Sequence, residues 1–415
     1  MPTTRSRRRI AVVTGSRAEF GLLLPVLRAV DAHKRLELQV IAAGSHFLAP
    51  ARTIREVEAS FPVAARVHMQ RSGHKTRLDD ARATARGIEG FSLAYAKLTP
   101  DWVVVLGDRV EAFAAAAAAA IAGIAVAHIH GGDRAEGIAD ESMRHAITKM
   151  AHLHLAATKQ SATRIVKMGE RPESVHVVGS PAIDGLAGIK PMSDAQARKL
   201  GDPRVIMLLH PSGFVPGTGR FKAAKKDPEG IFATLTYMGA CCLADEPPLG
   251  PCRNVGLTDS GGNGPRGIFL EPNHDAGHAA IRETWTRVSR YNGWPVVPHL
   301  PREQFIALLK RMARNRRGLV LGNSSAGLIE CSALGVPVVN VGPRQNGRER
   351  DRNVVDADPC DIFAFPGKMR RADRLAGKLR PSMRFGDGRT GPRIVRLLAA
   401  TDPHDPALHR KRNAY

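Results

Sequence analysis

The stretch RRIAVVTGSRAEFGLLL, residues 8–24, decides the fold class. Its first seven residues are rich in β-branched side chains and predict a strand, the glycine-bounded loop GSRAEFG follows, and a helix is expected to run to about His33. A strand, a glycine loop and a helix in this order are typical of the first unit of a parallel α/β sheet. The loop, residues 14–21, is either a plain turn or an anion site, because the N-terminus of a helix offers unpaired N–H groups. Arg17 is its candidate phosphate contact.

The same alternation continues along the chain. Helices are expected near residues 52–59 and 78–98, and a second α/β pattern begins at RVIMLLH, residues 204–210. The other predicted strands are LELQVIAAG (36–44), DWVVVLG (101–107), AVAHIHGG (125–132), HLHLAA (152–157), SVHVVGS (174–180), GIFLEPN (267–273), RGLVLGNSS (317–325) and VPVVNVG (336–342). These strands are apolar on both faces, as in parallel sheets covered by helices. We therefore expect an α/β protein with two Rossmann-like, doubly wound domains around a cleft.

The expected domains are residues 1–185 and 186–390, and we expect residues 391–415 to pack back on the N-terminal domain. Residues 213–266 do not fit the pattern, because they hold 10 glycines and 6 prolines without sustained periodicity. Structureless loops of that length are unusual inside a compact domain. The segment is predicted to be a surface insertion, with an active-site flap as the alternative.

Composition limits the class of protein. The 415 residues include five scattered cysteines without a CxxC pair, which argues against a disulfide framework or a structural zinc site. No run of eighteen apolar residues predicts a membrane span, and no signal peptide is evident, so we expect a cytoplasmic protein. The formal charge of +22 suits either nucleic acid or an anionic substrate. The basic residues are spread along the chain without a nucleic-acid-binding signature, so no nucleic-acid partner is expected.

Candidate site residues lie beyond the carboxyl ends of the predicted strands, where ligands bind in open α/β sheets. Asp108 and Arg109 follow the most apolar strand, and the carboxylate of Asp108 should be ionised beside the arginine. The alternative is that Asp108 only caps the next helix.

The stretch HIHGGDRAEGIADESMRHAITK, residues 128–149, packs three histidines and four carboxylates into 22 residues. His128 and His130 with Asp133 could hold a metal ion, because alternate strand residues share a face. An acid/base cradle is the better interpretation, and no metal is expected. His145 is placed on the flank of the following helix, where it would touch a ligand.

In the second half, NSS at residues 323–325 ends a strand and begins a helix. The hydroxyls of Ser324 and Ser325, with the helix N–H groups, would suit a diphosphate, although both are also good capping residues. Glu330 lies further along that helix, where it could accept a sugar hydroxyl. Arginines follow in VGPRQNGRERDRN, and arginine is the preferred residue for bidentate phosphate contacts. Two α/β domains with anion-friendly loops favour a nucleotide-sugar ligand.

Eight motifs occur in order: TGSRAEFGLL, GDRVEA, HIHGG, DESMRHAITK, GSPAID, PNHDAG, GNSSAG and RQNGRE. Over residues 8–212 and 267–356 the chain resembles the hydrolysing UDP-N-acetylglucosamine 2-epimerases of sialic-acid and legionaminic-acid synthesis. The resemblance implies a glycosyltransferase-B-type architecture and an anti elimination of UDP, followed by hydration of the glycal to the free 2-epimeric sugar. It implies a UDP-sugar substrate, either UDP-N-acetylglucosamine or a 2,4-diacetamido-trideoxy relative, and no metal or nicotinamide cofactor. We also expect a homo-oligomer, a dimer or tetramer.

The resemblance also implies roles for single residues. Asp108 and Asp140 match acidic positions at the reacting sugar, while Arg17 and Arg109 match positions near the diphosphate and sugar. The remaining binding positions carried over by motif are His210, Ser324, Ser325, Glu330 and Arg344, with Asp184 as a further contact. Some relatives have glutamate at the place of His130, so the C2 proton is assigned to His130, Asp133 or Asp140.

Three other functions fit the same residues. A non-hydrolysing epimerase or a glycosyltransferase could use the same scaffold, although the TGSRAEFGLL and RHAITK blocks favour the hydrolysing branch. The third alternative function is a catalytically weakened protein that binds a sugar nucleotide or a polyanion. The basic charge and the insertion at residues 213–266 motivate it.

Overall fold

A computed structural model describes residues 7–49, 52–71, 73, 76–136, 140–211, 266–272, 278–298, 300–358, 360, 361 and 363–412. The chain divides into two compact units. Unit 1 comprises residues 1–133, 139–185 and 385–415, and unit 2 comprises residues 134–138 and 186–384. None of the helices formed by these described residues is long and apolar enough to span a membrane. The predicted insertion at residues 213–266 lies outside the described residues except for Arg266.

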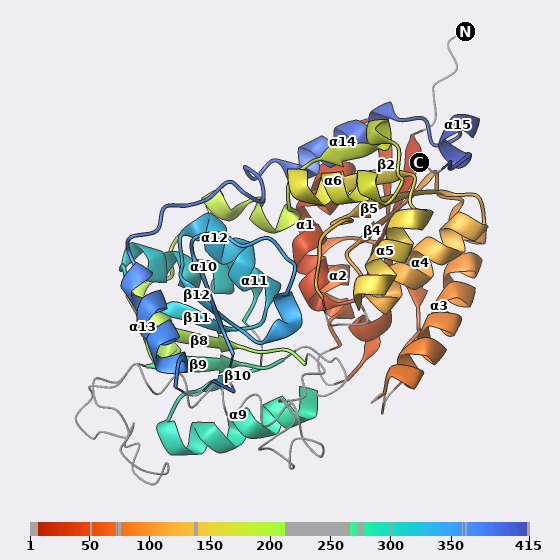
Figure 1. Cartoon of the computed structure of the whole chain (residues 1–415). Helices are drawn as coiled ribbons and strands as arrows, with labels where there is room; N and C mark the ends of the chain where they lie inside the picture. Colours follow the sequence, from red (N-terminus) through yellow and green to blue (C-terminus); the bar gives the residue numbers. More distant parts are fainter. Residues whose placement is uncertain are drawn as a thin grey trace. The chain divides into compact units, whose positions relative to one another are not determined.

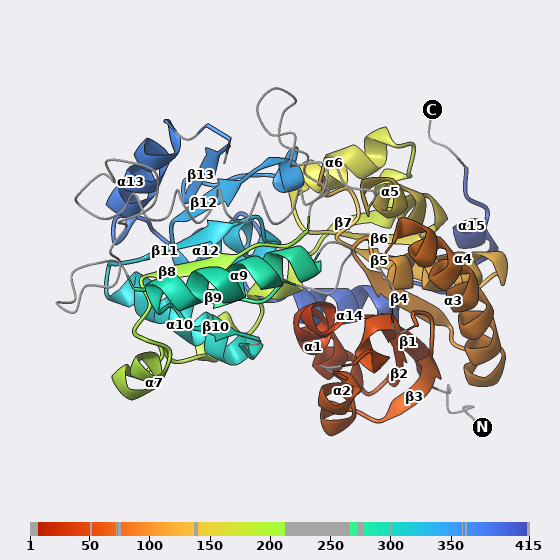
Figure 2. The same ribbon diagram turned by 90° about the horizontal axis from the view of Figure 1, so that it is seen from below.

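Unit 1 is built on a parallel sheet (red to yellow in Figure 1) with the strand order β3-β2-β1-β4-β5-β6-β7, which Figure 2 labels in full. Its strands are β1 (Arg8–Thr14), β2 (Leu36–Ala43), β3 (Val63–Val67), β4 (Trp102–Leu106), β5 (Ala125–Ile129), β6 (Leu153–Ala156) and β7 (Val175–Val177). Its helices are α1 (Arg17–Asp31), α2 (Ile54–Ser60), α3 (Arg77–Leu98), α4 (Val110–Ile121), α5 (Asp140–Met150), α6 (Lys159–Lys167), α14 (Thr390–Ala400) and α15 (Pro406–His409). The order changes direction between β1 and β4, which is the topological switch point of a Rossmann fold.

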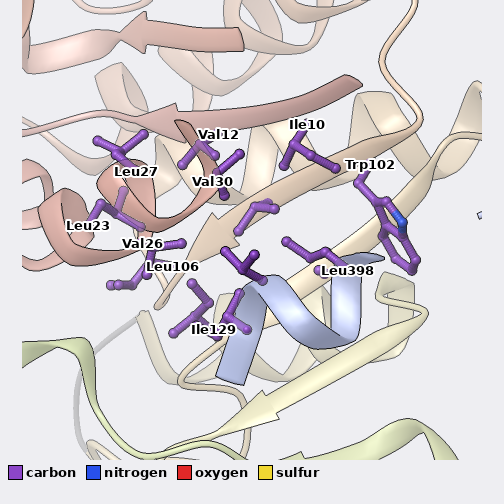
Figure 3. Close-up of a cluster of buried hydrophobic side chains, with 14 of the residues drawn as sticks. Ile10, Val12, Leu23, Val26, Leu27, Val30, Trp102, Leu106, Ile129 and Leu398 are labelled. Carbon is purple, nitrogen blue, oxygen red and sulfur yellow. The ribbon is translucent and has the colours of Figure 1, made fainter. Parts of the chain in front are cut away.

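The central strands β1, β4, β5 and β6 of unit 1 are buried on both faces because helices cover both. Ile10 and Val12 of β1 join one core cluster with α1 and α14, whereas Ala11 and Val13 join another with α3 and α4. Figure 3 shows the first cluster, in which Leu398 of α14 points toward the strand residues. Alternate residues of each apolar run therefore lie in the two hydrophobic cores on opposite faces of the sheet, as expected for a parallel sheet covered by helices.

The N-terminus of α1 is fixed by its own sequence. The Ser16 side chain accepts a hydrogen bond from the Glu19 backbone N–H and so caps the helix. The C-terminal helix α14 packs on α1 within unit 1, although the two helices are far apart in the chain (Figure 2). The seven-alanine run lies in α4, which packs against α3. Small alanine side chains let the two helices approach closely.

Unit 2 repeats the pattern with the parallel order β10-β9-β8-β11-β12-β13. Its strands are β8 (Val205–Leu208), β9 (Gly267–Leu270), β10 (Val296–Val297), β11 (Leu319–Gly322), β12 (Val338–Val341) and β13 (Val354–Ala357). Its helices are α7 (Asp194–Lys199), α9 (His278–Asn292), α10 (Arg302–Arg314), α11 (Ser325–Leu328), α12 (Glu330–Leu334) and α13 (Phe365–Leu375). The rings of Phe269 and Trp285 stack at 4.7 Å in its core.

The predicted fold class, α/β with two Rossmann-like units, is confirmed. One element differs from its prediction: the expected single helix after residues 323–325 is two short helices, α11 and α12. The break falls at Ile329, whose φ of −98° and ψ of −68° distort the helical turn before Glu330 begins α12. Sequence reasoning also missed β3, β10, β13 and α13, because they are short or carry too few apolar residues to stand out.

Candidate functional site

The first group of candidate residues lies in unit 1, beyond the carboxyl ends of β1, β4 and β5. The loop after β1 carries Arg17, and the loop after its neighbour β4 carries Asp108 and Arg109. His130 follows β5, which pairs with β4 on its other side. The sheet order therefore brings three predicted stretches to one edge, at the switch point where α/β proteins bind ligands.

The loop after β1 is held by a buried carboxyl group. Glu19 is 5% exposed and accepts a hydrogen bond from the Gly15 N–H at 2.7 Å. Burial, with the nearby charge of Glu111, raises the pKa of Glu19 to about 8. Arg17 at the start of α1 is partly buried, and this burial lowers the pKa of its guanidinium, although Glu56 opposes the effect. Glu19 thus fixes the backbone beside the arginine that was predicted to bind phosphate.

A second buried carboxylate, Glu111, supports the same loop from α4. Its side chain is 0% exposed, and it accepts hydrogen bonds from Gln70 at 2.8 Å and from Arg109 at 3.3 Å. It packs so closely on Gly15 that a Cβ atom there would meet Glu111 atoms at 2.5 Å. Gly15 is therefore required for this approach, and Arg109 is oriented by a carboxylate that sequence reasoning missed.

Asp108 forms an ion pair with Arg144 of α5. The Arg144 side chain is 2% exposed and that of Asp108 is 20% exposed. Arg144 also donates to the Asp133 carbonyl oxygen at 3.0 Å and to Glu141 at 3.2 Å. The N-cap of α4 is Arg109, not Asp108, so the capping role for Asp108 is wrong. The arginine paired with Asp108 thus comes from α5 and is not the neighbouring Arg109 that the sequence suggested.

His130 lies in a buried chain of hydrogen bonds. Its Nδ1 is 3.0 Å from an Asp133 carboxylate oxygen, and its Nε2 is 2.9 Å from the Ser180 hydroxyl. The other Asp133 oxygen accepts from the Ser161 hydroxyl at 2.7 Å. His130 has a φ of +65°, in the left-handed region that costs a non-glycine residue about 1 kcal/mol. These side-chain partners hold it in that conformation, and such residues concentrate at functional sites.

His128 supports the loop that carries Asp108. It is fully buried, and its Nε2 lies 2.7 Å from the Gly107 carbonyl oxygen, while Nδ1 is 3.3 Å from the Thr148 hydroxyl. Burial lowers the pKa of His128 to about 3, so the imidazole is neutral and donates to Gly107. Both nitrogens of His128 and of His130 thus have protein partners. Among the described residues no group of three or more His, Cys, Asp or Glu residues could hold a metal ion.

The remaining predicted residues of unit 1 are Asp140, His145 and Asp184. Asp140 begins α5, and its side chain lies outside the described residues. The His145 side chain is 36% exposed on the flank of α5, where its Nε2 lies 3.2 Å from Glu141. Asp184 is buried and accepts from the backbone N–H groups of Thr390 and Gly391 at 2.9 and 2.7 Å. Both of its oxygens therefore cap α14, which gives Asp184 a structural role.

In unit 2 the second group gathers beyond β8, β11 and β12. Asn323, fully buried after β11, accepts from the His210 N–H at 2.8 Å and donates to its carbonyl oxygen at 2.9 Å. His210 is thereby fixed at the end of β8. Asn323 was part of a predicted motif but not a predicted site residue, and it links two of the loops.

Ser324 and Ser325 directly follow β11, and Glu330 comes later in the chain, at the start of α12. Ser324 caps α11, since its side chain accepts from the Ala326 N–H at 3.4 Å, and Ser325 is the first helical residue. Glu330 is 5% exposed and forms an ion pair with Arg302 of α10 at 3.0 Å. Arg302 escaped prediction because it lies 28 residues earlier on another helix.

Arg344 completes this group from the loop after β12. Its guanidinium donates to the Asn323 carbonyl oxygen at 3.2 Å, and Gln345 donates to the same oxygen at 2.8 Å. Arg348 donates to the Gln345 side chain at 3.0 Å. Unit 2 therefore places hydroxyl, amide and guanidinium groups around the end of β11, a donor set that suits an anion.

Two Rossmann-like units with candidate residues at the carboxyl ends of their strands define a fold of the glycosyltransferase-B type. The sequence profile of the family described as UDP-N-acetylglucosamine 2-epimerase matches residues 28–225 and 259–399. The chain belongs to this family, as its eight motifs indicated.

Individual relatives agree with this assignment. A UDP-N,N'-diacetylbacillosamine 2-epimerase (hydrolyzing) of Legionella pneumophila is 32% identical over 417 residues, covering 98% of this chain and 100% of the relative. A UDP-N-acetylglucosamine 2-epimerase of Neisseria meningitidis is 29% identical over 358 residues, covering 85% and 84%.

Solved structures show the same fold at lower identity. The S. aureus MnaA–UDP co-structure matches with a TM-score of 0.72 at 19% identity, covering 94% of this chain and 96% of that one. The UDP-GlcNAc 2-epimerase of Neisseria meningitidis bound to UDP-GlcNAc matches with a TM-score of 0.71 at 17% identity, covering 95% and 100%. At these identities the likeness is evidence for the fold alone.

Proposed function

We propose that the protein is a hydrolysing 2-epimerase that converts a UDP-2-acetamido sugar to the free 2-epimeric sugar and UDP. The substrate is UDP-N-acetylglucosamine or a UDP-2,4-diacetamido-trideoxyhexose such as UDP-N,N'-diacetylbacillosamine. The observation that carries the proposal is the Asp108–Arg144 ion pair at the switch point of unit 1. It supplies a partly exposed carboxylate whose partner is deeply buried. The full-length likeness to the Legionella relative, whose name includes hydrolysis, supports the hydrolysing branch.

The reaction has two balanced steps. In the first, the C2 proton is removed and the bond between C1 and the UDP oxygen breaks, which leaves a C1–C2 double bond. In the second, water adds its hydroxyl to C1, and C2 receives a proton on the opposite face. The sum is UDP-sugar and water giving UDP and the free epimer. Both steps require acid/base groups, and carboxyl groups in different environments suit them.

We assign the carboxylate facing the reacting sugar to Asp108 and the removal of the C2 proton to Asp140. The basis is that Asp133 is 6% exposed and uses both oxygens for His130 and Ser161. His130 is 6% exposed and shares its Nε2 with Ser180. Those hydrogen bonds suit positioning residues that shape the loop between β5 and α5. Asp140, at the N-terminus of α5, has the helix dipole to favour its ionised form.

We assign UDP to the groups after β11 and β12. Ser324 and Ser325 would contact the diphosphate, with His210 and Arg344 beside them, and Glu330 would accept a ribose hydroxyl. Arg17 and Arg109 of unit 1 would stabilise charge on the departing diphosphate, and His145 would contact the sugar. Glu111 supports this role for Arg109 because it orients the guanidinium. The proposed partners of the protein are its UDP-sugar and further copies of the same chain.

A product assay in D₂O tests the reaction. The protein is incubated with UDP-N-acetylglucosamine and, separately, with UDP-N,N'-diacetylbacillosamine, and NMR follows the products. Hydrolysis predicts UDP and free sugar in equal amounts, with deuterium at C2 of the epimer. An epimeric UDP-sugar without free sugar would identify a non-hydrolysing enzyme. Absence of turnover with both substrates would refute the proposal, and tight binding without turnover would favour a sugar-nucleotide binding protein.

The assignment of the C2 proton is tested by two variants. Asp140→Asn should abolish the release of UDP, because no base remains to remove the C2 proton. His130→Gln should lower turnover but leave it measurable, as expected for a residue that only positions the loop. The reverse pattern would move the proton transfer to His130.

A further inference from the structure

The C-terminal segment of the chain, residues 401–412, runs along unit 1 and makes an ordered series of contacts. Arg8 donates to the Thr401 carbonyl oxygen at 2.8 Å, and His404 lies 3.0 Å from Asp101. The ring of His409 lies 5.0 Å from that of His152. These contacts lead the segment across the amino-terminal edge of the sheet to the end of α5, so the position of Lys411 is defined.

The ammonium group of Lys411 closes the C-terminal end of α5. It donates to the carbonyl oxygens of Lys149 at 2.7 Å and Thr148 at 3.4 Å, and also to that of Ala151. The last carbonyl groups of a helix lack partners within the helix. A cation at this end is also favoured by the helix dipole. Lys411 therefore satisfies carbonyl groups at the end of α5 from a distance of 260 to 263 residues in sequence.

A buried carboxylate fixes Lys411 in this place. Glu170 is 3% exposed and lies 2.8 Å from the Lys411 ammonium and 2.6 Å from that of Lys149. His154 lies 3.1 Å from the same carboxylate. Burial alone would raise the pKa of Glu170, but these three partners lower it to about 2. The carboxylate is thus ionised at every working pH, and Lys411 is held between it and the end of the helix.

The other end of α5 carries the groups assigned to the reaction. Arg144, one turn before Thr148, forms the ion pair with Asp108. The Thr148 hydroxyl donates to the Arg144 carbonyl oxygen at 3.1 Å and contacts His128, which holds Gly107 beside Asp108. Lys411 and the Asp108–Arg144 pair are therefore joined through a single helical turn and one buried histidine.

We propose that Lys411 is a positioning residue of the reaction: it locks the C-terminal turn of α5 and thereby holds Arg144 against Asp108. The C-terminal segment is then part of the active-site framework, although it contributes no group to the substrate. The inference rests on the proposed function in treating Asp108 as the carboxylate at the reacting sugar. Its geometric part, the locking of α5, stands without that assignment.

Steady-state kinetics and hydrogen exchange on the full-length protein test this role. Lys411→Met keeps the side-chain length and removes the charge and the donors. We expect kcat to fall about tenfold while KM for the UDP-sugar stays within about twofold, since the change acts on alignment in the transition state. Amide exchange in α5, residues 140–150, should become faster at the same temperature. Lys411→Arg, which keeps a charged donor, should recover most of kcat.

The matched control is Arg412→Met, which removes an exposed cation with no hydrogen bond or ion pair in the described part of the chain. Its kcat and α5 exchange should equal those of the wild type. Lys411→Gln, which keeps N–H donors without charge, provides a second variant if Lys411→Met does not fold. It should give an intermediate kcat.

The outcomes separate the two proposals. A lower melting temperature for Lys411→Met with unchanged kcat well below that temperature would show a purely stabilising role and overturn the inference. Unchanged exchange in α5 would overturn it as well. If the wild type itself releases no UDP, the proposed function fails, and the exchange data still decide whether Lys411 locks α5.

Discussion

Replacing Glu19 by glutamine should increase the free energy of unfolding relative to the wild type, and this difference should grow as the pH rises. Glu19 is buried and its pKa is raised to about 8, first by burial and second by the charge of Glu111. The Gly15 N–H and Arg109 oppose the shift without cancelling it. The folded state therefore holds a proton on Glu19 that the unfolded state releases near pH 4.5. Glutamine has the same shape, stays neutral and can accept the same hydrogen bond from Gly15.

The size of the effect follows from linkage. The folded-state pKa is above the unfolded one, so the stabilisation from protonated Glu19 is complete below about pH 4.5 and is lost as the pH rises through 8. A shift from 4.5 to about 8 corresponds to about 5 kcal/mol at 1.36 kcal/mol per pH unit. Relaxation around a buried group reduces this figure, so it is an upper value. The free energy of unfolding of Glu19→Gln should not fall in this way. Its difference from that of the wild type should therefore increase throughout this pH range.

The measurement is the free energy of unfolding in urea from pH 5 to pH 9. The difference between Glu19→Gln and the wild type should grow steadily with pH and level off above about pH 8. Glu37→Gln, an exposed glutamate on β2, is the control and should show no such growth. A constant difference between Glu19→Gln and the wild type across the whole range would refute the buried, protonated state of Glu19.

Three further predictions concern the proposed reaction. Asp108→Asn should lower turnover at least about a hundredfold, as expected for loss of a charge-stabilising or acid/base group, and UDP release measures it; unchanged turnover would remove Asp108 from the mechanism. Ser325→Ala should weaken UDP binding about fivefold in calorimetry, the loss of about one hydrogen bond, and intact affinity would count against a diphosphate contact. Glu330→Gln should weaken UDP as an inhibitor and leave pyrophosphate inhibition unchanged, because the carboxylate is assigned to ribose; equal effects on both would place it at the phosphates instead.

The fold was predictable from the sequence because parallel strands leave a simple signal. Ile10 to Val13 are apolar in every position, and each face of β1 meets its own layer of helices. Strands such as β3, with the sequence VAARV, and β10, with two residues, carry too little of that signal. They are partly exposed edge strands, and the pairing with a neighbouring strand stabilises them.

The position of a candidate residue was predictable where a motif and a strand end coincide, as for Asp108 after β4. Its contacts were not predictable where the partner comes from another element. Arg144 was read only as part of a helix, because nothing in the sequence relates it to a residue 36 positions earlier. The same holds for Ser180 with His130, and for Lys411 with α5. Such pairs arise from the order of strands in the sheet and from where the C-terminal segment passes, and a single sequence states neither.

The environments of Glu19 and Asp108 explain why two carboxyl groups at one sheet edge can have opposite roles. Glu19 follows β1, is buried beside another carboxylate, and is neutral at pH 7. Asp108 follows the neighbouring strand β4, remains partly exposed, and is paired with the buried guanidinium of Arg144, which favours its charged form. The sequence shows both simply as acids near a helix N-terminus. Burial and partner decide that Glu19 fixes the loop beside Arg17, while Asp108 keeps a partly exposed carboxyl group. In the proposed elimination this division would matter, because an ionised carboxylate next to Arg17 would compete with the diphosphate for that arginine.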